Sequence, residues 1–271
     1  MVLAGGLEMG ERLTTLIQRV YVLFCLAFIF CPIVTLIVFS FNVDRFPSLP
    51  WKGFSLAWYQ ALFEDPTIID AFQNTLTVGI CVALVSTFLG FTAAYFDFRW
   101  DFAWKRAYLA IVILPPTIPF LILGLALLLF LSRIGLGSSL TGVFVSHVVI
   151  CTPFALAIIR MRLAEMDKGL EEAAWNLGAS EWRSVLVVIL PFVLPALVAA
   201  ALITMAVSFD EFMIAWFVSG LDQTLPVKIL LLLQGQVSPR INAIGTIVFA
   251  VSFTLVAIAQ IILLLTRRDN A

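Results

Sequence analysis

Charged residues are scarce in this sequence. Asp, Glu, Lys and Arg make up 12% of its 271 residues, and the formal net charge is −1, whereas charged residues are about a quarter of a typical soluble domain. Apolar residues make up 62%, and the mean hydropathy is +1.08. This composition excludes an ordinary soluble domain and indicates a polytopic protein surrounded by a lipid bilayer. The near-zero net charge also gives a nucleic-acid partner no electrostatic support.

Cysteine and nucleotide-binding motifs are equally sparse. The four cysteines, Cys25, Cys31, Cys81 and Cys151, stand inside apolar runs without paired or metal-ligand spacing, so we expect neither a disulfide nor a metal site. The sequence has no G-x(4)-G-K-[ST] phosphate loop, so the chain cannot hydrolyse ATP through a Walker site of its own. We therefore predict no cofactor and no catalytic residue, and any energy that the chain needs must come from another subunit or from a gradient.

Six apolar runs are long enough to cross a bilayer, whose core of about 30 Å needs about 20 helical residues. They cover residues 21–41, 72–96, 107–131, 141–159, 185–208 and 243–266. The sequence thus predicts an all-α integral membrane fold with six transmembrane helices in one domain, 21–266. We expect 1–20 to be a cytoplasmic N-terminal segment, because it lacks the short apolar core and cleavage site of a signal peptide, and 267–271 to be a cytoplasmic tail.

Basic residues outside these runs are divided unequally between the two sides of the membrane. The side that carries both termini has eleven of them: Arg12, Arg19, Arg99, Lys105, Arg106, Arg160, Arg162, Lys168, Arg183, Arg267 and Arg268. The opposite side has five: Arg45, Lys52, Arg133, Lys228 and Arg240. Because cytoplasmic segments carry the excess of Lys and Arg, we predict that both termini and the segment 165–191 are cytoplasmic.

The longest polar interruption, at 170–191, has the pattern of two short helices joined by a turn. Asp167 can cap the first helix, and Glu171 and Glu172 suit the positive end of its dipole. Gly178 permits the left-handed residue that ends many helices, and Ser180 can cap a second helix. From these features alone, the segment is either an ordinary loop between membrane helices or a docking site for a partner.

The same segment resembles the EAA loop of ABC importer permeases, whose pattern is E-A-A-x(3)-G-x(9)-I-x-L-P. The E-A-A run at 172–174 and Gly178 match the pattern, and only Val188, in place of Ile, departs from it. The resemblance implies a type I ABC importer permease fold in which 165–191 carries the coupling helix that docks on a cytoplasmic ATPase. The candidate ATPase-coupling residues are Glu171, Glu172, Ala173, Ala174, Trp175, Leu177 and Gly178.

This family likeness also implies partners. Such a permease would pair with a second, homologous permease and sit on a dimer of ABC ATPase subunits, which bind the ATP. It would receive its solute from an extracytoplasmic binding protein. The chain itself would be a transport subunit of the bacterial inner membrane and not an enzyme, and the second permease would be either a copy of this chain or a sister subunit.

Three further runs resemble the spermidine/putrescine branch of these permeases: S-F-D-E-F at 208–212, T-L-P-V-K-I at 224–229 and S-P-R-I-N-A at 238–243. The resemblance covers most of the chain from Asn42 onward and implies a polyamine as the imported solute. One position departs, because the branch commonly has an acidic residue where this chain has Arg240. The alternative solutes are therefore another small cation, an amino-acid derivative or a metal chelate.

Three prolines interrupt the third apolar run and make it a candidate for lining the solute path. Proline has no backbone N–H, so Pro115, Pro116 and Pro119 remove hydrogen bonds from a membrane helix and bend it. The carbonyl groups that lose their partners must then be satisfied by neighbouring helices or by a water-lined path. The two interpretations are a bend that lines the path and a bend that only serves packing.

The carboxylates that follow the fifth run are candidates for the outer gate. Asp210 and Glu211 fall near the predicted outer boundary of the bilayer, where they either form part of a cation path or end the helix in water. The run 212–218 is too short to cross the bilayer and predicts a re-entrant or interfacial helix. Trp216, in the middle of this run, completes the candidate gate residues.

Three other functions remain as alternatives. A gradient-driven carrier is disfavoured because the six runs have no Asp, Glu, Lys or Arg in their central thirds, and we expect the lone His147 to be a hydrogen-bonded packing residue rather than a proton relay. An intramembrane protease is disfavoured because Ser219, at the outer surface, lacks a nucleophile motif. A passive structural subunit needs only helices and a docking loop, and nucleotide-dependent movement of the outer gate would distinguish it from a permease.

Overall fold

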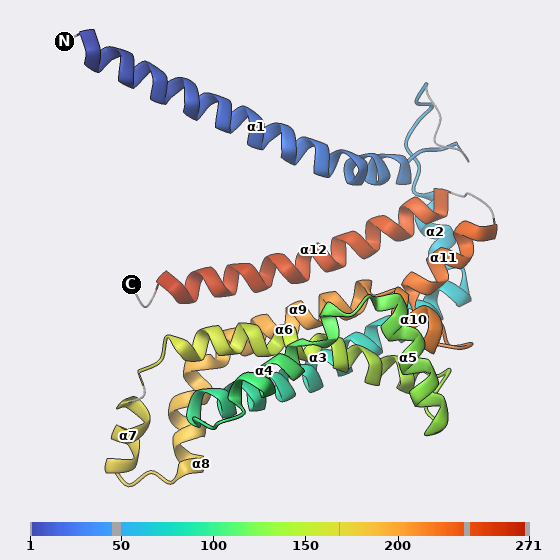
Figure 1. Ribbon diagram of the computed structural model, residues 1–271. Coiled ribbons are helices and arrows are strands. Elements are labelled where there is room, and N and C mark those ends of the chain that lie inside the picture. The colour runs from blue at the N-terminus through green and yellow to red at the C-terminus, as the bar shows by residue number, and fades with distance from the viewer. Residues whose placement is uncertain (1, 45–49, 168, 236–238, 269–271) are drawn as a thin grey trace. The chain divides into compact units, whose positions relative to one another are not determined.

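The computed structural model describes residues 2–44, 50–167, 169–235 and 239–268 and is built of helices (Figure 1). The helices are α1 (Val2–Ser40), α2 (Ala57–Phe63), α3 (Pro66–Arg99), α4 (Lys105–Ile113), the 3₁₀ helix η1 (Pro115–Thr117), α5 (Phe120–Arg133), α6 (Leu140–Ala164), α7 (Gly169–Asn176), α8 (Glu181–Ser184), the π-helix η2 (Val185–Ile189), α9 (Leu190–Asp210), α10 (Met213–Val218), α11 (Leu225–Gly235) and α12 (Pro239–Arg268). Across the described ranges, β-type pairing is confined to one bridge between Asn42 and Phe54. The predicted all-α fold is confirmed.

The chain divides into two compact units. The first is formed by the described residues within 1–62 and 236–246, and the second by those within 63–235 and 247–271. The first unit therefore holds α1, nearly all of α2 and the beginning of α12. The second unit holds α3 to α11 and most of α12, and it contains both of the candidate sites.

The first unit is dominated by α1, a long apolar helix. Its 39 residues extend about 58 Å at about 1.5 Å per residue, well beyond a bilayer core of about 30 Å. The stretch Leu13–Ser40 has a mean hydropathy of 3.0, which suits a helix that crosses a lipid bilayer. The hydroxyls of Ser40 and Tyr59 lie 2.7 Å apart, and Trp58 Nε1 donates to Asn42 O at 2.7 Å. These contacts anchor α2 to the end of α1.

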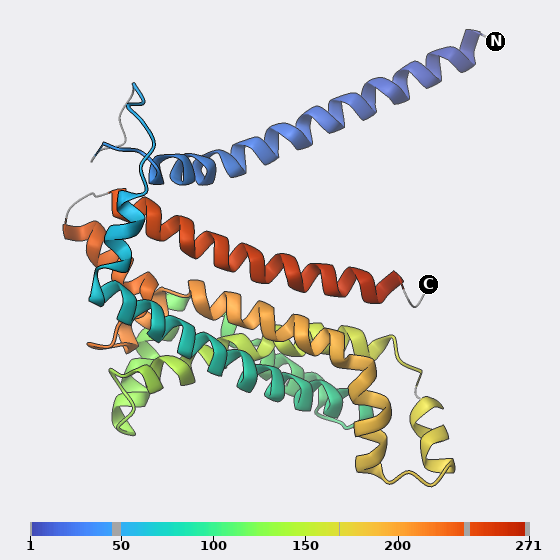
Figure 2. The ribbon, with the colours of Figure 1, turned by 180° about the vertical axis from the view of Figure 1, so that it is seen from behind.

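The second unit is organised around three long helices, α3, α6 and α9, which lie side by side in both views (Figure 1 and Figure 2). Their apolar faces form the buried core, to which Val82, Ile150 and Val193 contribute fully buried side chains. Gly90 of α3 allows the closest approach, because a Cβ atom at this position would lie only 2.6 Å from the Cβ of Ala155 on α6. Small residues at such crossings let membrane helices pack backbone against backbone.

Five helical stretches are long and apolar enough to cross a membrane: Leu13–Ser40, Pro66–Arg99, Leu140–Ala164, Glu181–Asp210 and Arg240–Thr266. Each of them corresponds to one of the six predicted spans. The remaining predicted span, 107–131, is divided between α4, with 9 residues, and α5, with 14 residues. The structure thus supports a multi-pass membrane protein in which the third crossing is an interrupted helix.

The interruption follows from the three prolines. Pro115 and Pro116 begin η1, and neither has a backbone N–H to continue the ladder of α4. Ile118 is extended, with φ −81° and ψ 134°, because a residue that precedes proline is crowded out of the helical region. Pro119 then stands as the N-cap of α5. The prolines therefore produce a complete break where the sequence predicted a bend.

A second irregularity lies between α8 and α9. Leu190 N donates to Val185 O, five residues earlier, which makes Val185–Ile189 one turn of π-helix. Pro191 follows in the first turn of α9. Because proline lacks the N–H and crowds the preceding turn, the wider π turn accommodates it. α8 and α9 consequently point in different directions (Figure 2).

The structure describes most of the predicted N-terminal segment, 1–20, but only part of the predicted C-terminal tail, 267–271. α1 begins at Val2, so the N-terminal segment 1–20 is largely helical and continuous with the first span. α12 ends at Arg268, and the last three residues of the predicted tail, 269–271, lie outside the described residues. The cytoplasmic orientation of the two termini stays a prediction.

Candidate functional site

The coupling loop, residues 165–191, lies at one end of the second unit, where α7 and α8 project beyond the long helices (Figure 1). Asp167 Oδ1 accepts a hydrogen bond of 2.9 Å from the backbone at the start of α7. Gly178 has a φ of +88°, in the left-handed region that glycine adopts without steric penalty. Ser180 caps α8 by accepting from Arg183 N at 3.3 Å. The predicted helix–turn–helix is confirmed, with its turn at Gly178.

The seven candidate coupling residues form an outward and an inward group. The outward group is exposed: Glu172, Ala173, Leu177 and Gly178. The inward group is half-buried or buried: Ala174, Trp175 and Glu171. Leu177 is 90% exposed, and the nearby Trp182 is 79% exposed. Two large apolar side chains open to solvent at one polar turn are typical of a surface that contacts another protein, whereas the inward group faces this chain.

The inward group is held by an arginine at the end of α3. Arg99 Nη1 forms an ion pair with Glu171 Oε1, to which the Tyr95 hydroxyl also donates at 3.1 Å. The guanidinium carbon lies 4.5 Å from the centroid of the Trp175 ring, within the range of a cation–π contact. Arg99 Nη2 lies 3.4 Å from Glu181 Oε1. In the sequence, Arg99 is distinguished only as one of the basic residues outside the apolar runs, and the signal for its contacts is its position in the last turn of α3.

A second ionic cluster joins the same end of α3 to α4 and α6. Arg160 Nε donates to Asp97 Oδ2 at 2.6 Å, and Lys105 Nζ lies 3.6 Å from Asp97 Oδ1. The Asp97 side chain is only 6% exposed, so its two cationic partners offset the cost of burying its charge. A cavity of about 550 Å³ opens beside this cluster. The end of α3 is thus fixed by ionic contacts to α4 and α6 through Asp97 and to α7 and α8 through Arg99.

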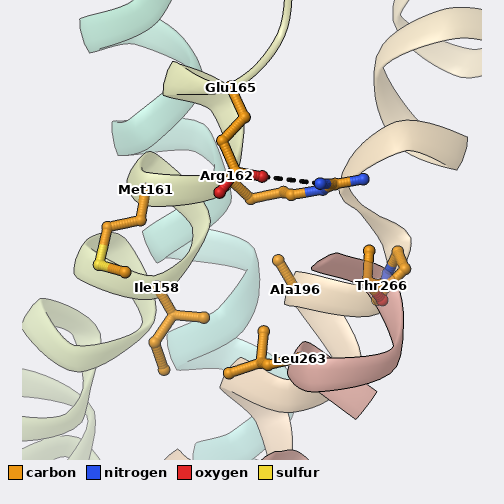
Figure 3. Close-up of a pocket in the computed structure, with 8 residues that line it drawn as sticks. Ile158, Met161, Arg162, Glu165, Ala196, Leu263 and Thr266 are labelled. Atoms are coloured by element: carbon orange, nitrogen blue, oxygen red, sulfur yellow. Dashed lines mark hydrogen bonds and ion pairs between the residues drawn. The ribbon is translucent and has the colours of Figure 1, made fainter. Parts of the chain in front are cut away.

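A smaller cavity of about 70 Å³ lies between α6, α9 and α12, and Figure 3 shows the residues around it. Its single cation, Arg162, is already paired with Glu165 at 2.7 Å and donates from Nε to Phe192 O at 3.2 Å. The other side chains around it, including Ile158 and Leu263, are mostly apolar. The size and the satisfied charge indicate a packing feature rather than a solute site.

The opposite end of the second unit holds a cavity of about 540 Å³ that combines apolar side chains with a carboxylate. It is lined by Phe120, Ile203, Ala206, Val207, Asp210, Glu211, Phe212, Met213 and Val256. Asp210 is exposed, and its Oδ1 accepts a hydrogen bond of 2.8 Å from Ser252 Oγ on α12. A carboxylate in an otherwise apolar cavity is suited to bind a cationic group.

Glu211, the next residue, is used differently. It is only 6% exposed, and its carboxylate accepts hydrogen bonds from Ile214 N at 2.9 Å and Ala215 N at 3.0 Å, which caps the start of α10. Its Oε2 also lies 3.1 Å from His147 Nε2, and His147 Nδ1 lies 2.9 Å from Ser208 Oγ. The prediction that His147 is a hydrogen-bonded packing residue is confirmed. Both carboxylates line the cavity, but Glu211 is nearly buried and fixes the turn between α9 and α10, whereas Asp210 is exposed.

The remaining path candidates lie beside this cavity or apart from it. Pro119 immediately precedes Phe120, which lines the cavity. The ring of Trp216 on α10 lies 6.1 Å from that of Phe212, another lining residue. Pro115 and Pro116, in η1, are not among the lining residues. Asp210, Glu211 and the neighbours of Pro119 and Trp216 therefore lie together at this cavity, the candidate gate cavity, and their role in an outer gate stays a prediction.

The search for metal ligands gives no candidate centre in the described ranges. No group of three or more His, Cys, Asp or Glu side chains there could hold a metal ion. The four cysteines are free thiols. The described side chains at the two candidate sites offer ionic and hydrogen-bonding contacts.

The sequence matches the family described as "Binding-protein-dependent transport system inner membrane component" over residues 86–268. The chain is 34% identical over 245 residues to the spermidine/putrescine transport system permease protein PotC of Haemophilus influenzae, covering 90% of this chain and 94% of that protein. It is 31% identical to the putrescine transport system permease protein PotI of Escherichia coli (strain K12), covering 82% of this chain and 81% of the relative.

Solved structures show the same fold. A bacterial ABC transporter involved in the import of the acidic polysaccharide alginate superposes with a TM-score of 0.70 at 15% identity, covering 93% of this chain and 96% of that chain. The MetNI methionine ABC transporter has a TM-score of 0.56 at 22% identity, covering 73% of this chain and 99% of the other. With the family match over two thirds of the sequence and relatives aligned over most of its length, the chain belongs to the binding-protein-dependent transport system inner membrane components, the permease subunits of ABC importers.

Proposed function

We propose that this permease imports a polyamine, such as spermidine or putrescine, delivered by an extracytoplasmic binding protein. The observation that carries the proposal is the position of Asp210 in the gate cavity. Its carboxylate stands among apolar and aromatic side chains, which suits a solute with cationic amines joined by methylene chains. The printed names of the relatives PotC and PotI, which are spermidine/putrescine and putrescine permeases, point to the same solute class.

The energy for this import would come from a separate pair of ATPase subunits that dock on the coupling loop. The exposed group around Glu172 and Leu177 is the docking surface in this proposal, and Glu171 lies behind it. ATP-driven closure of the ATPases would move the loop, and rotation of the packed helices would then exchange inward- and outward-facing states. The charge count supports a cytoplasmic position for the loop and for both termini.

A second permease would complete the path. The apolar stretch Leu13–Ser40 of α1, with a mean hydropathy of 3.0, suits contact with lipid or with a partner helix. In this proposal the partner permease supplies a further wall of the gate cavity. Solute specificity would then be shared between the two permeases and the binding protein.

A gradient-driven carrier is the second candidate, and the geometry does not favour it. Such carriers need an ionisable side chain that can exchange a proton or ion within the membrane. His147 is fully buried, and both of its ring nitrogens have partners in Ser208 and Glu211. Its contacts serve the turn between α9 and α10 instead.

The experiment that tests the proposal is ATP hydrolysis by the purified complex in lipid, with and without the binding protein, spermidine and putrescine. We expect hydrolysis to rise only when binding protein and polyamine are both present. Stimulation by a different solute would retain the importer and contradict the polyamine assignment. Purification of the chain without any ATPase subunit, from cells that express the whole system, would contradict the proposed energy source.

A further inference from the structure

One helix, α3, has polar contacts with both candidate sites of the second unit. Its last residue, Arg99, contacts the coupling loop, and its first third contacts the segment that follows the gate helix α10. The 24 residues from Thr75 to Arg99 span about 36 Å at about 1.5 Å per residue. Between these ends α3 packs along α6 and α9 without a helix break. A continuous packed helix of this length can carry a displacement from one end to the other.

The cytoplasmic contact depends on one side chain that reaches both arms of the coupling loop. Arg99 pairs with Glu171 on α7 and with Glu181 on α8, which stand on opposite sides of the Gly178 turn. The Arg99 and Glu171 side chains are 13% and 7% exposed, so this pair is shielded from solvent and resists screening by salt. The guanidinium carbon also lies 4.5 Å from the centroid of the Trp175 ring. Arg99 therefore holds the two arms of the loop and the end of α3 as one body.

The opposite contact consists of two hydrogen bonds near the gate. Leu225 N donates to Thr75 Oγ1 at 2.6 Å, and Asn74 Nδ2 donates to Gln223 O at 3.2 Å. Gln223 lies in the segment between α10 and α11, and Leu225 is the first residue of α11. Thr75 is 2% exposed and Leu225 is 2% exposed. The gate segment is thus attached to α3 by its backbone, so a shift of α3 shifts the position of α10.

We propose that Arg99 is a positioning residue for coupling: it links movement of the coupling loop to α3 and, through Thr75 and Asn74, to the gate segment. The inference rests on the proposed ATP-driven function and adds an internal linkage to it. In this arrangement Glu171 pairs with Arg99 inside the chain, and the exposed Glu172 is free to contact the ATPase. Loss of Arg99 should leave the docking surface in place while the movement of the gate is no longer tied to ATP.

The experiment measures movement of the gate independently of the solute. Met213 lines the gate cavity and is 48% exposed, so Met213→Cys, in a chain whose four native cysteines are replaced, reports opening through its rate of modification by a polar thiol reagent. The rate is measured in the complete complex with and without ATP, in four backgrounds: unchanged, Arg99→Met, Arg99→Glu with Glu171→Arg, and Arg106→Met. Arg106 is an exposed arginine close to Arg99 in the sequence and is the matched control.

We expect ATP to change the labelling rate about tenfold in the unchanged and Arg106→Met backgrounds, the order of a typical coupling between sites. Arg99→Met should abolish this response while the ATPase still co-purifies, and the exchanged pair should restore most of it. Arg99→Lys keeps the positive charge but loses the planar guanidinium that reaches two carboxylates and the Trp175 ring, so it should give a partial response. This variant also provides a test if the Arg99→Met complex fails to assemble.

Two results would overturn the inference: an ATP response in Arg99→Met or Arg99→Lys equal to that of the unchanged protein, or no restoration by the exchanged pair. A failure of the polyamine proposal looks different. In that case the labelling rate still responds to ATP through Arg99, but spermidine and putrescine stimulate neither hydrolysis nor uptake.

Discussion

His147 Nε2 lies 3.1 Å from Glu211 Oε2, and this buried contact joins α6 to the turn between α9 and α10. The same carboxylate caps the first turn of α10 through Ile214 N and Ala215 N. One pair therefore fixes the direction in which the gate helix leaves α9. It also leaves the neighbouring carboxylate, Asp210, facing the gate cavity.

Removal of the imidazole should destabilise the protein more than it alters solute recognition. His147→Ala deprives the buried Glu211 of a hydrogen-bond partner and leaves an unfilled space, at a cost of about 2–5 kcal/mol. The measurement is thermal unfolding of the purified complex in detergent. His147→Gln, which keeps a donor near Glu211, is the matched control and should recover part of the loss. A His147→Ala complex as stable as the unchanged one would show that the contact between His147 and Glu211 does not contribute to stability.

The two neighbouring carboxylates should respond differently to neutralisation. Asp210→Asn should raise the KM for a cationic solute about tenfold with little effect on the amount of folded protein, because a carboxylate–cation contact in a partly apolar cavity is worth about 1–2 kcal/mol. Glu211→Gln should chiefly lower stability, because that carboxylate serves as a cap. Uptake kinetics and thermal unfolding of both variants separate the two roles. Unchanged uptake kinetics for Asp210→Asn would remove this residue from the path.

Changes in the coupling loop should uncouple transport without preventing membrane insertion. Gly178 has a φ of +88°, which proline, fixed near −65°, cannot adopt, so Gly178→Pro should break the turn and separate α7 from α8. Glu172→Lys reverses the exposed charge of the proposed docking surface. Both variants should reach the membrane in normal amounts yet lose most solute uptake, which cell fractionation and an uptake assay would measure. Normal uptake by both would refute the coupling assignment.

The crossing of α3 and α6 allows a paired test of packing. A Cβ added at Gly90 would lie 2.6 Å from the Ala155 Cβ and 2.8 Å from Leu156 N, whereas one added at Gly79 would meet its nearest atom at 3.7 Å. Gly90→Ala should therefore force the helices apart and cost about 1–3 kcal/mol, and Gly79→Ala should be nearly neutral. Thermal unfolding of the two variants gives the comparison. Equal stability of both would contradict the close approach at Gly90.

Local sequence was sufficient for the features that depend on near neighbours. The caps at Asp167 and Ser180 and the left-handed Gly178 involve residues a few positions apart, so the sequence predicts them directly. The lengths of the apolar runs likewise predict most of the spans. The break of the third span was underestimated, because the sequence shows that Pro115 and Pro119 weaken a helix but not whether neighbours hold the two parts in line.

The contacts that organise both sites join residues far apart in the sequence. Arg99 and Glu171 are separated by 72 positions, and His147 and Glu211 by 64. Whether two such side chains meet depends on how each helix is rotated about its own axis. The same limitation applies to Asp210 and Glu211, because adjacent residues differ by about 100° around a helix. Their sequence context is alike, and only the fold exposes Asp210 in the cavity and buries Glu211 as the cap of α10.

The most direct test of the central claim is uptake of labelled spermidine into vesicles that contain the complete complex, with ATP supplied on the coupling-loop side and the binding protein on the other. The account predicts accumulation that needs both ATP and binding protein, is competed by unlabelled putrescine and is lost with Glu172→Lys. Accumulation driven by an ion gradient without ATP would contradict the assignment as an ATP-driven importer. ATP-dependent transport that excludes polyamines and accepts another solute would contradict the proposed substrate.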